Sequence, residues 1–343
     1  MCPLRVIPKN FLFDEEELTP KLRAQRTLNR SRIPEISTYL VENPRSYVFS
    51  SITASIDGKV AFESFAETGV GQNVGRLLIP MTSRFLINDG QHRRAAIEEA
   101  LKQCPELGDE MLSVVFFIDA GLKRSQQMFA DLNRHAIRPT QSIGILYDHR
   151  DHLSQLARTL VEEVSVFRNF TELEKTTISN RSNKLHTLSS IYQATRTLLG
   201  KSKRAKVTDK EQRLAIDFWE HVGNSIVDWQ LAVQKKVGCA ELRRDYVHAH
   251  GLALQAIAIV GATLLSGELQ KWKRTIAGLQ EIDWSRSNVK LWEGRALVSG
   301  RISKAQMHVV LTSNVIKKQL GMSLTAKEKE AESRLRDSRK NAA

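Results

Sequence analysis

The feature that most constrains the fold is a short apolar run that passes through a tight turn into a helical pattern. Residues 85–87 are apolar and few enough for a strand, and small and aliphatic residues recur at helical spacing over 95–101. Between them, Asn88, Asp89 and Gly90 are residues typical of a turn. The pattern therefore predicts a strand, a turn and a helix in succession, as in a mixed α/β domain.

The residues that open this predicted helix indicate an anion-binding turn. The first backbone amides of a helix have no partner within the helix, and the helix dipole places partial positive charge there. Gly90 permits a positive φ or the close approach of a ligand, and His92, Arg93 and Arg94 add side-chain donors. We predict a phosphate-recognising turn. The alternative is an ordinary Asp-Gly turn followed by solvated arginines.

The same residues resemble a family signature. Asp89-Gly90-Gln91-His92-Arg93, between an apolar strand and an Ala-rich helix, resembles the motif of the DGQHR-domain proteins, which are similar to the ParB/sulfiredoxin-like superfamily. Within that group the chain resembles the DndB family of bacterial DNA sulfur-modification (phosphorothioation) regulators. Residues 129–136, 183–189 and 292–295 agree with this resemblance, which covers residues 26–324.

The resemblance implies a DNA-binding transcriptional regulator, a repressor, of a phosphorothioation gene cluster, which is a restriction-modification type of system. Double-stranded operator or promoter DNA is the implied partner, with other phosphorothioation proteins as further partners. The resemblance also places the helix end at residues 133–134 opposite the turn. The predicted phosphate- or nucleotide-binding residues are therefore Asp89, Gly90, Gln91, His92, Arg93, Asn133 and Arg134.

A second interpretation is an enzyme. Superfamily relatives bind or hydrolyse nucleotides, so the resemblance also fits a ParB-like protein that hydrolyses ATP or CTP, with Asp89 holding Mg²⁺ and the basic residues on the phosphates. One departure argues against it, because Asp131 and Asn133 are separated by Leu132 where relatives often carry a Glu-Asn pair. The first interpretation predicts no catalytic residue, metal or cofactor, and the second predicts a nucleotide with magnesium.

Composition narrows the classes of protein further. The chain has 343 residues, of which 41% are hydrophobic and 26% charged, and this suits a folded protein of about two domains rather than a disordered one. The formal net charge of +13 and the isoelectric point near 9.7 point to a polyanionic partner. Nucleic acid is the first expectation and an anionic membrane surface the second.

Cysteine usage and hydropathy bear on the compartment. Cys2, Cys104 and Cys239 are far apart and odd in number, which argues against a disulfide framework or a structural zinc site. No signal peptide is evident, and the longest apolar run, 251–265, is shorter than the ~20 residues of a membrane-spanning helix. We therefore expect a cytoplasmic protein with no membrane partner.

Hydrophobic periodicity divides the chain into four parts and gives the fold class α+β. Residues 1–25 form an N-terminal arm, and residues 26–150 form an α/β domain with a small mixed sheet, which the family resemblance implies to be ParB-like. Residues 151–325 form an all-helical domain, because strand patterns nearly vanish there. Residues 326–343 form a charged tail that we expect to be disordered.

Within these parts, particular elements are predicted. A strand over 48–54 is expected to pair with a returning strand at 59–62 as a hairpin, and residues 74–79 are expected to pair with 84–87. Residues 304–320 have the length of a helix-turn-helix, with a polar turn at 312–314. Two packed surface helices are the alternative for that last segment.

Basic clusters predict contacts with DNA phosphates. Each neutralised phosphate releases counterions, so several patches give salt-dependent affinity without base readout, although each patch alone could be a solvated face. A DNA-binding regulator is also expected to be a homo-oligomer, by default a two-fold dimer. The predicted DNA-binding residues are Arg30, Arg32, Lys201, Lys203, Arg204, Lys235, Lys236, Arg243, Arg244, Lys317 and Lys318.

Two further groups have competing interpretations. Cys239 is surrounded by basic residues that would lower the pKa of its thiol and make it reactive, whereas the alternative is a small buried cysteine. His248 and His250 are two positions apart and face different ways on a helix, so we expect them to pack or cap rather than to share a metal.

Overall fold

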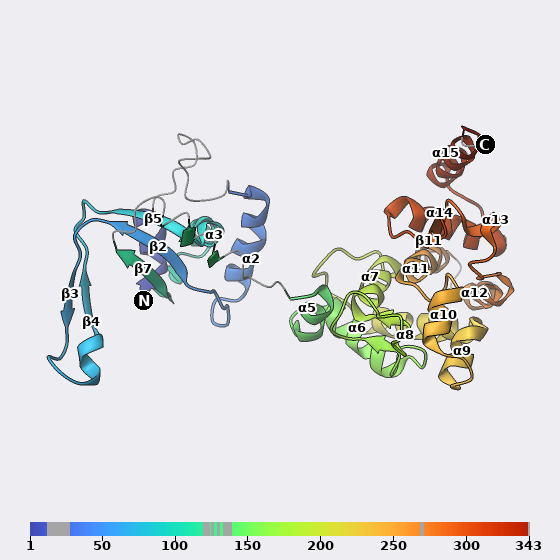
Figure 1. Ribbon diagram of the computed structural model, residues 1–343, viewed down its shortest axis with the longest axis horizontal. Coiled ribbons are helices and arrows are strands. Elements are labelled where there is room, and N and C mark those ends of the chain that lie inside the picture. Colours follow the sequence, from blue (N-terminus) through green and yellow to red (C-terminus); the bar gives the residue numbers. More distant parts are fainter. Residues whose placement is uncertain are drawn as a thin grey trace. The chain divides into compact units, whose positions relative to one another are not determined.

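The computed structural model describes residues 1–11, 28–118, 124, 127–128, 131–132, 139–267 and 271–341. The chain forms two compact units, Met1–Ile137 and Arg138–Ala343, which are described separately below (Figure 1). The division falls earlier than the expected residue 150. The reason is that α5 (Gln141–Tyr147) places Ile145 in a hydrophobic cluster with residues of the second unit.

The first unit is built on a three-stranded mixed sheet. Its central strand β2 (Ile52–Asp57) pairs antiparallel with β5 (Arg84–Asp89) and parallel with β7 (Val114–Ile118). Helix α3 (Gln91–Gln103) leaves β5 through Gly90, so the predicted strand, turn and helix are present. The small mixed sheet and the helical second half confirm the predicted α+β class.

Helix α2 (Ile33–Glu42) packs against α3, and the core of the first unit is formed by the sheet, these two helices and the N-terminal segment. The N-terminal segment is part of this core, since Leu4 and Ile7 are fully buried. The remaining elements of the unit are β1 (Cys2–Pro3), which pairs with β6 (Met111–Leu112), η1 (Leu4–Val6), α1 (Ile7–Asn10), η2 (Arg30–Arg32), η3 (Val70–Asn73) and η4 (Pro105–Asp109).

A hairpin of β3 (Ala61–Ser64) and β4 (Gly75–Leu78) extends away from this sheet (Figure 1). The predicted pairings were therefore wrong, because β3 pairs with β4 and β2 pairs with β5. Pairing β2 with β5 places Ile56 and Ile87 in positions where both are buried. All four residues of β3 are exposed, so its pattern offers no apolar face to a core.

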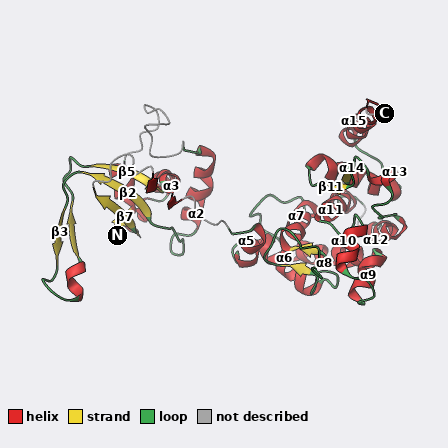
Figure 2. Cartoon of the chain, viewed as in Figure 1, coloured by secondary structure: helices red, strands yellow, loops and turns green. Residues whose placement is uncertain are grey.

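In the described part of the second unit, the regular elements are helices and four two-residue strands (Figure 2). Helix α11 (Gly251–Leu265) is enclosed by the others and packs against α7 (Leu188–Leu198) and α14 (Gln306–Gln319). The other helices are α6 (His152–Glu163), α8 (Asp209–Ser225), α9 (Val227–Val233), α10 (Cys239–Asp245), α12 (Trp272–Ala277), η5 (Gly278–Glu281), α13 (Val289–Trp292) and α15 (Ala326–Asn341). The strands are β8 (Thr171–Glu172), β9 (His186–Thr187), β10 (Leu297–Val298) and β11 (Arg301–Ile302). None of the helices in the described ranges combines the length and apolar composition that crossing a membrane requires.

Helix α14 corrects the helix-turn-helix prediction. Thr312, Ser313 and Asn314 lie inside one continuous helix and are fully buried instead of forming a turn. The Nδ2 of Asn314 donates to the main-chain oxygen of Glu328, 3.1 Å away. These polar residues are therefore part of an interface between helices, which their intrinsic preference for turns does not reveal.

Helix α15 replaces the expected disordered tail. Lys317 Nζ lies 2.7 Å from Glu328 Oε1, and Glu332 pairs with both Arg295 and Lys318. Glu328 and Thr325 also form a reciprocal cap at the start of the helix, since each backbone N–H donates to the other's side chain. The mixed charges thus serve a helix that is held against α14 by partly buried ion pairs.

We predict that Glu328→Ala lowers the free energy of unfolding by about 3–5 kcal/mol, because it leaves the ammonium of Lys317 buried without a counter-charge. Chemical denaturation followed by circular dichroism measures this change. Glu330→Ala is the matched control on the same helix, because its pair with Arg334 is exposed, and it should change stability by less than about 0.5 kcal/mol. Equal effects of the two variants would contradict a stabilising buried ion pair between Lys317 and Glu328.

Candidate functional site

The Asp-Gly-Gln-His-Arg turn is built around Gly90. This glycine is the N-cap residue of α3 and has φ +115°, in the left-handed region. A Cβ at this position would lie 2.9 Å from Cγ1 of Ile52, so both the backbone conformation and the close approach favour glycine. Next to the turn, Asn88 is fully buried and donates to Ser55 Oγ at 2.7 Å.

The guanidinium of Arg93 connects the end of β5 to the start of β2. Its Nη2 donates to Asp89 Oδ2 at 2.7 Å and to the main-chain oxygen of Ser51 at 3.2 Å. Its Nη1 donates to Ser50 Oγ at 2.7 Å. An arginine that bonds a carboxylate, a carbonyl and a hydroxyl at once fixes the geometry of the turn.

The neighbouring basic residues have other protein partners. The Nε2 of His92 accepts the N–H of Asn29 at 3.0 Å, so in the neutral ring the proton is on Nδ1. Arg94 donates to the main-chain oxygens of Phe11 and Pro8 at 2.7 and 2.8 Å. These contacts hold the N-terminal segment and the 28–30 region against α3.

The structure thus gives this turn a bracing role. The phosphate-binding role predicted for Asp89, Gly90, Gln91, His92 and Arg93 stays a prediction. The two remaining members of that predicted set, Asn133 and Arg134, lie outside the described residues. Within the described ranges, no three histidine, cysteine or carboxylate side chains lie close enough together to hold a metal ion.

The predicted DNA-binding residues differ in exposure and in their partners within the protein. Lys201, Arg244 and Lys318 are paired with Glu211, Asp245 and Glu332, each at 2.7 Å. Arg204 is exposed. Among the predicted contacts, the exposed cations whose side chains have no hydrogen bond or ion pair with the described residues are Arg30, Arg32, Lys203, Lys235 and Lys236.

The predicted DNA contact of Lys317 was wrong, and Arg243 is engaged within the protein. Lys317 is 2% exposed and is neutralised by Glu328, so it has no access to a phosphate. Arg243 donates from its guanidinium to main-chain oxygens of a neighbouring loop, and it therefore holds that loop in place. The oxygens belong to Ser179, Asn180, Ser182 and Lys184.

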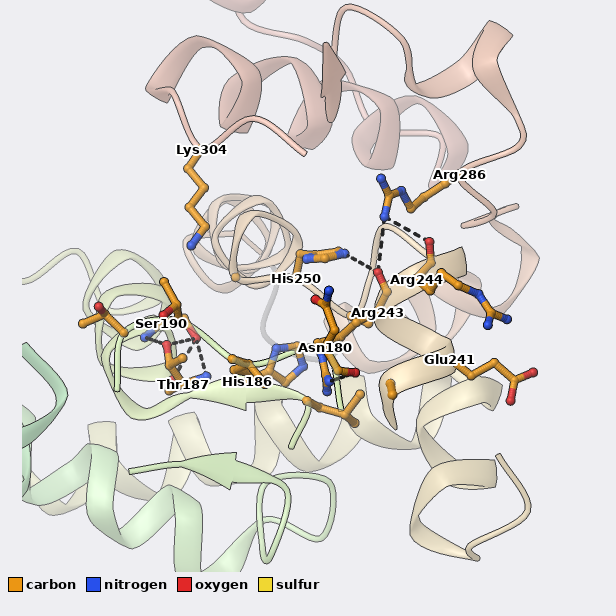
Figure 3. Close-up of a pocket in the computed structure, with 17 residues that line it drawn as sticks. Asn180, His186, Thr187, Ser190, Glu241, Arg243, Arg244, His250, Arg286 and Lys304 are labelled. Atoms are coloured by element: carbon orange, nitrogen blue, oxygen red, sulfur yellow. Dashed lines mark hydrogen bonds between the residues drawn. The ribbon is translucent and has the colours of Figure 1, made fainter. Parts of the chain in front are cut away.

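That loop bounds a cavity of about 620 Å³ in the second unit (Figure 3). The sequence patterns did not point to this site, because its walls come from several separate segments. Residues 183–189, which carry part of the family resemblance, supply Leu185, His186 and Thr187 to the lining. The polar and charged lining includes Asn180, His186, Thr187, Ser190, Arg286 and Lys304.

Three histidines lie in or behind this cavity, and burial lowers the pKa of each one. The pKa of His186 falls to about 3 and that of His250 to about 4, with burial as the main cause. The Nε2 of His250 lies 2.8 Å from the main-chain oxygen of Arg243. Trp229 Nε1 donates to Nδ1 of His248, whose Nε2 then carries the proton and donates to Asp228 at 2.9 Å.

The buried interpretation of Cys239 is confirmed. Its side chain is buried in the hydrophobic core, and burial raises the pKa of the thiol despite the opposing effect of Arg243. A raised pKa lowers the fraction of reactive thiolate. His248 and His250 likewise pack and bond within the unit, as expected.

Comparison with models of protein families identifies the family of this chain. The family model for DndB, described as DNA-sulfur modification-associated, matches residues 1–323. The chain belongs to the DndB family. Membership of the DndB family implies involvement in DNA sulfur modification and confirms the resemblance seen in the sequence. No curated protein and no solved structure matches the chain.

The buried histidines predict the pH dependence of stability. Because their folded pKa lies below the ordinary 6.5, the unfolded chain binds protons that the folded chain does not. Stability is therefore complete above pH 6.5 and is lost as the pH falls, by about 1.4 kcal/mol per pH unit for each such histidine. Urea unfolding between pH 7 and 5 measures the slope.

The variant His186→Phe should reduce this slope by about 1.4 kcal/mol per pH unit, since it removes one of the buried titrating rings. The exposed His152→Phe is the matched control and should leave the slope as it is. A stability that does not change between pH 7 and 5 would contradict neutral buried histidines.

Proposed function

We propose that this DndB-family protein is a DNA-binding transcriptional regulator, a repressor, of a DNA phosphorothioation gene cluster. The observation that carries the proposal is the family match over residues 1–323, taken together with the formal net charge of +13. A surplus of this size favours association with a polyanion, and DNA is the polyanion on which the modification acts. Other phosphorothioation proteins are further proposed partners.

The exposed cations without described partners are the best-suited phosphate contacts. Arg30 and Arg32 lie in η2 of the first unit, and Lys203, Lys235 and Lys236 lie in the second. Side chains of this kind position a protein on the DNA backbone and carry no sequence information by themselves. We therefore propose that these residues set affinity and its salt dependence rather than the choice of operator.

The Asp-Gly-Gln-His-Arg turn enters this proposal as a further phosphate contact, because Gly90 leaves the start of α3 without a side-chain cap. The alternative is a nucleotide-hydrolysing enzyme. The observation in its favour is the carboxylate of Asp89, which is 44% exposed beside that same helix start. Magnesium-dependent release of phosphate from ATP or CTP, abolished by Arg93→Ala, would support the enzyme instead.

We propose that the regulator is a homo-oligomer and that the β3–β4 hairpin contributes to the interface. A two-stranded hairpin with no further support is marginally stable in water. This hairpin exposes apolar residues along its length, with Phe62 opposite Leu77 and with Leu78 and Val74 also exposed. A second copy of the chain would cover these side chains and match the two-fold symmetry of paired operator half-sites.

Affinity for the cluster's own promoter should fall steeply with salt. The double variant Lys235→Ala/Lys236→Ala should reduce the slope of log affinity against log salt by about 0.9 for each phosphate contact that is lost. Fluorescence anisotropy with a promoter duplex between low and moderate salt measures this slope. The control Lys290→Ala/Lys329→Ala removes the same charge from exposed positions outside the proposed contacts and should leave the slope near that of the wild type. Absence of promoter binding at low salt would overturn the proposal that the protein is a DNA-binding regulator.

The oligomer is tested by replacing apolar residues of the hairpin. Phe62→Ser/Leu78→Ser should convert the oligomer to a monomer, because both side chains are exposed in the single chain and would be covered only by another copy. Size-exclusion chromatography with light scattering reports the mass. Val289→Ser, at another exposed apolar position, is the control and should leave the mass unchanged. A monomeric wild type, or a variant that stays oligomeric, would contradict this role of the hairpin.

A further inference from the structure

The cavity of the second unit lies where the N-terminal ends of two long helices meet. Thr187 and Ser190, at the start of α7, line it together with His250 and Gly251, at the start of α11. The two helix ends are close because position 251 has no side chain. A Cβ there would lie 2.9 Å from the Cβ of Ser190.

This arrangement makes the cavity electropositive. The positive ends of both helix dipoles point to it, and α11 has no side-chain cap because His250 is directed to the main-chain oxygen of Arg243 instead. Lys304 extends its ammonium toward the same space, whereas the carboxylate of Glu241 points away (Figure 3). Among the described residues no ion pair engages Lys304. An anion would therefore be favoured at the start of α11.

A second, independent observation points to a ligand. His186 is 2% exposed and lines the cavity, yet neither of its ring nitrogens has a hydrogen-bond partner among the described residues. Its ring is held by edge contacts with Phe167 and Trp229, at centroid distances of 6.1 and 5.1 Å. A buried polar group left without a partner costs about 1–3 kcal/mol, so a partner from outside the chain is the natural explanation.

The kind of partner follows from the chemistry of this ring. A neutral imidazole has one nitrogen that donates and one that accepts, which suits an uncharged group such as the edge of a nucleobase. Asn180 adds an amide with the same dual capacity, and Leu185 and Ile178 supply apolar wall. The anion site and the neutral polar site are therefore lined by different residues of one cavity.

The volume of the cavity favours a small organic ligand over a simple ion. The cavity measures about 620 Å³, and a second one of about 220 Å³ shares Thr176, Thr187, Ser190, Gly251 and Lys304 with it. Small-molecule sites occupy roughly 300–1,000 Å³, which is far more than an inorganic phosphate fills.

We propose that this cavity binds a nucleoside phosphate, with its phosphate at the start of α11 beside Lys304 and its base edge at His186. The proposal does not depend on DNA binding by the exposed cations. It assigns the chain a small-molecule site in the helical unit, separate from the Asp-Gly-Gln-His-Arg turn.

The test is isothermal titration calorimetry of the full chain with nucleoside 5′-monophosphates and 5′-triphosphates. Inorganic phosphate and the parent nucleosides serve as comparison probes. At least one nucleotide should bind, and phosphate alone or nucleoside alone should bind at least about 10-fold more weakly, because each occupies only one part of the cavity. Binding of none of the nucleotides, or equally tight binding of inorganic phosphate, overturns the proposal.

Two variants place the binding in the cavity. Lys304→Met and His186→Phe should each weaken nucleotide binding about 10- to 100-fold, as expected for the loss of a charge-assisted or buried hydrogen bond. His186→Phe should stay folded, because the histidine nitrogens bond no described residue and the new ring can keep the contacts with Phe167 and Trp229. Lys304→Arg should restore most of the affinity.

Two controls separate this cavity from other sites. Lys290→Met removes an exposed charge from a residue that is not part of the cavity lining and should leave nucleotide binding unchanged. Arg93→Ala tests the turn of the first unit. Nucleotide binding that survives both cavity variants, or that is lost only in Arg93→Ala, refutes the proposal. Promoter binding in the same samples reports separately on the regulator.

Discussion

The second unit depends on the burial of one apolar helix. Helix α11 is covered along most of its length, and Gly261 leaves room for the ring of Phe218, which a Cβ at this position would approach to 2.4 Å. Helices α7 and α14 pack against this helix, since hydrophobic stabilisation grows with the apolar area that they remove from water. The same packing brings the starts of α7 and α11 together, so the hydrophobic core determines where the polar cavity lies.

The first unit uses charge differently. Its best-defined motif directs Arg93 and Arg94 to carbonyl and hydroxyl groups of segments that are distant in the sequence, including the lead into β2 and the N-terminal residues. A guanidinium has several donors in a fixed plane, which lets the single side chain of Arg93 bond a carboxylate, a carbonyl and a hydroxyl at once. A short family signature can thus owe its residue types to the assembly of the fold as well as to any ligand.

Local pattern was sufficient for the strand, turn and helix at Gly90 and for the α+β class, because each rests on neighbouring residues. It was not sufficient to tell which charged side chains are buried and which are exposed. Lys235 and Lys317 have similar surroundings in the sequence. Only the packing of α15 against α14 shows that Lys317 is buried and paired with Glu328. The cavity around His186 was beyond reach for the same reason, because its lining comes from separate segments. The Thr325 and Glu328 spacing was a usable signal for α15 that the charge pattern obscured.

The ion pairs between α14 and α15 show that the folded unit extends beyond the C-terminal limit of the family match. The family match ends at residue 323, whereas the carboxylates that neutralise Lys317, Lys318 and Arg295 come from residues 328 and 332. A version of the chain cut at the limit of the family match would leave Lys317 and Lys318 of α14, and Arg295 beside them, without these counter-charges. The boundary of the folded unit therefore includes the first turns of α15, which supply these counter-charges, and lies beyond the end of the family match.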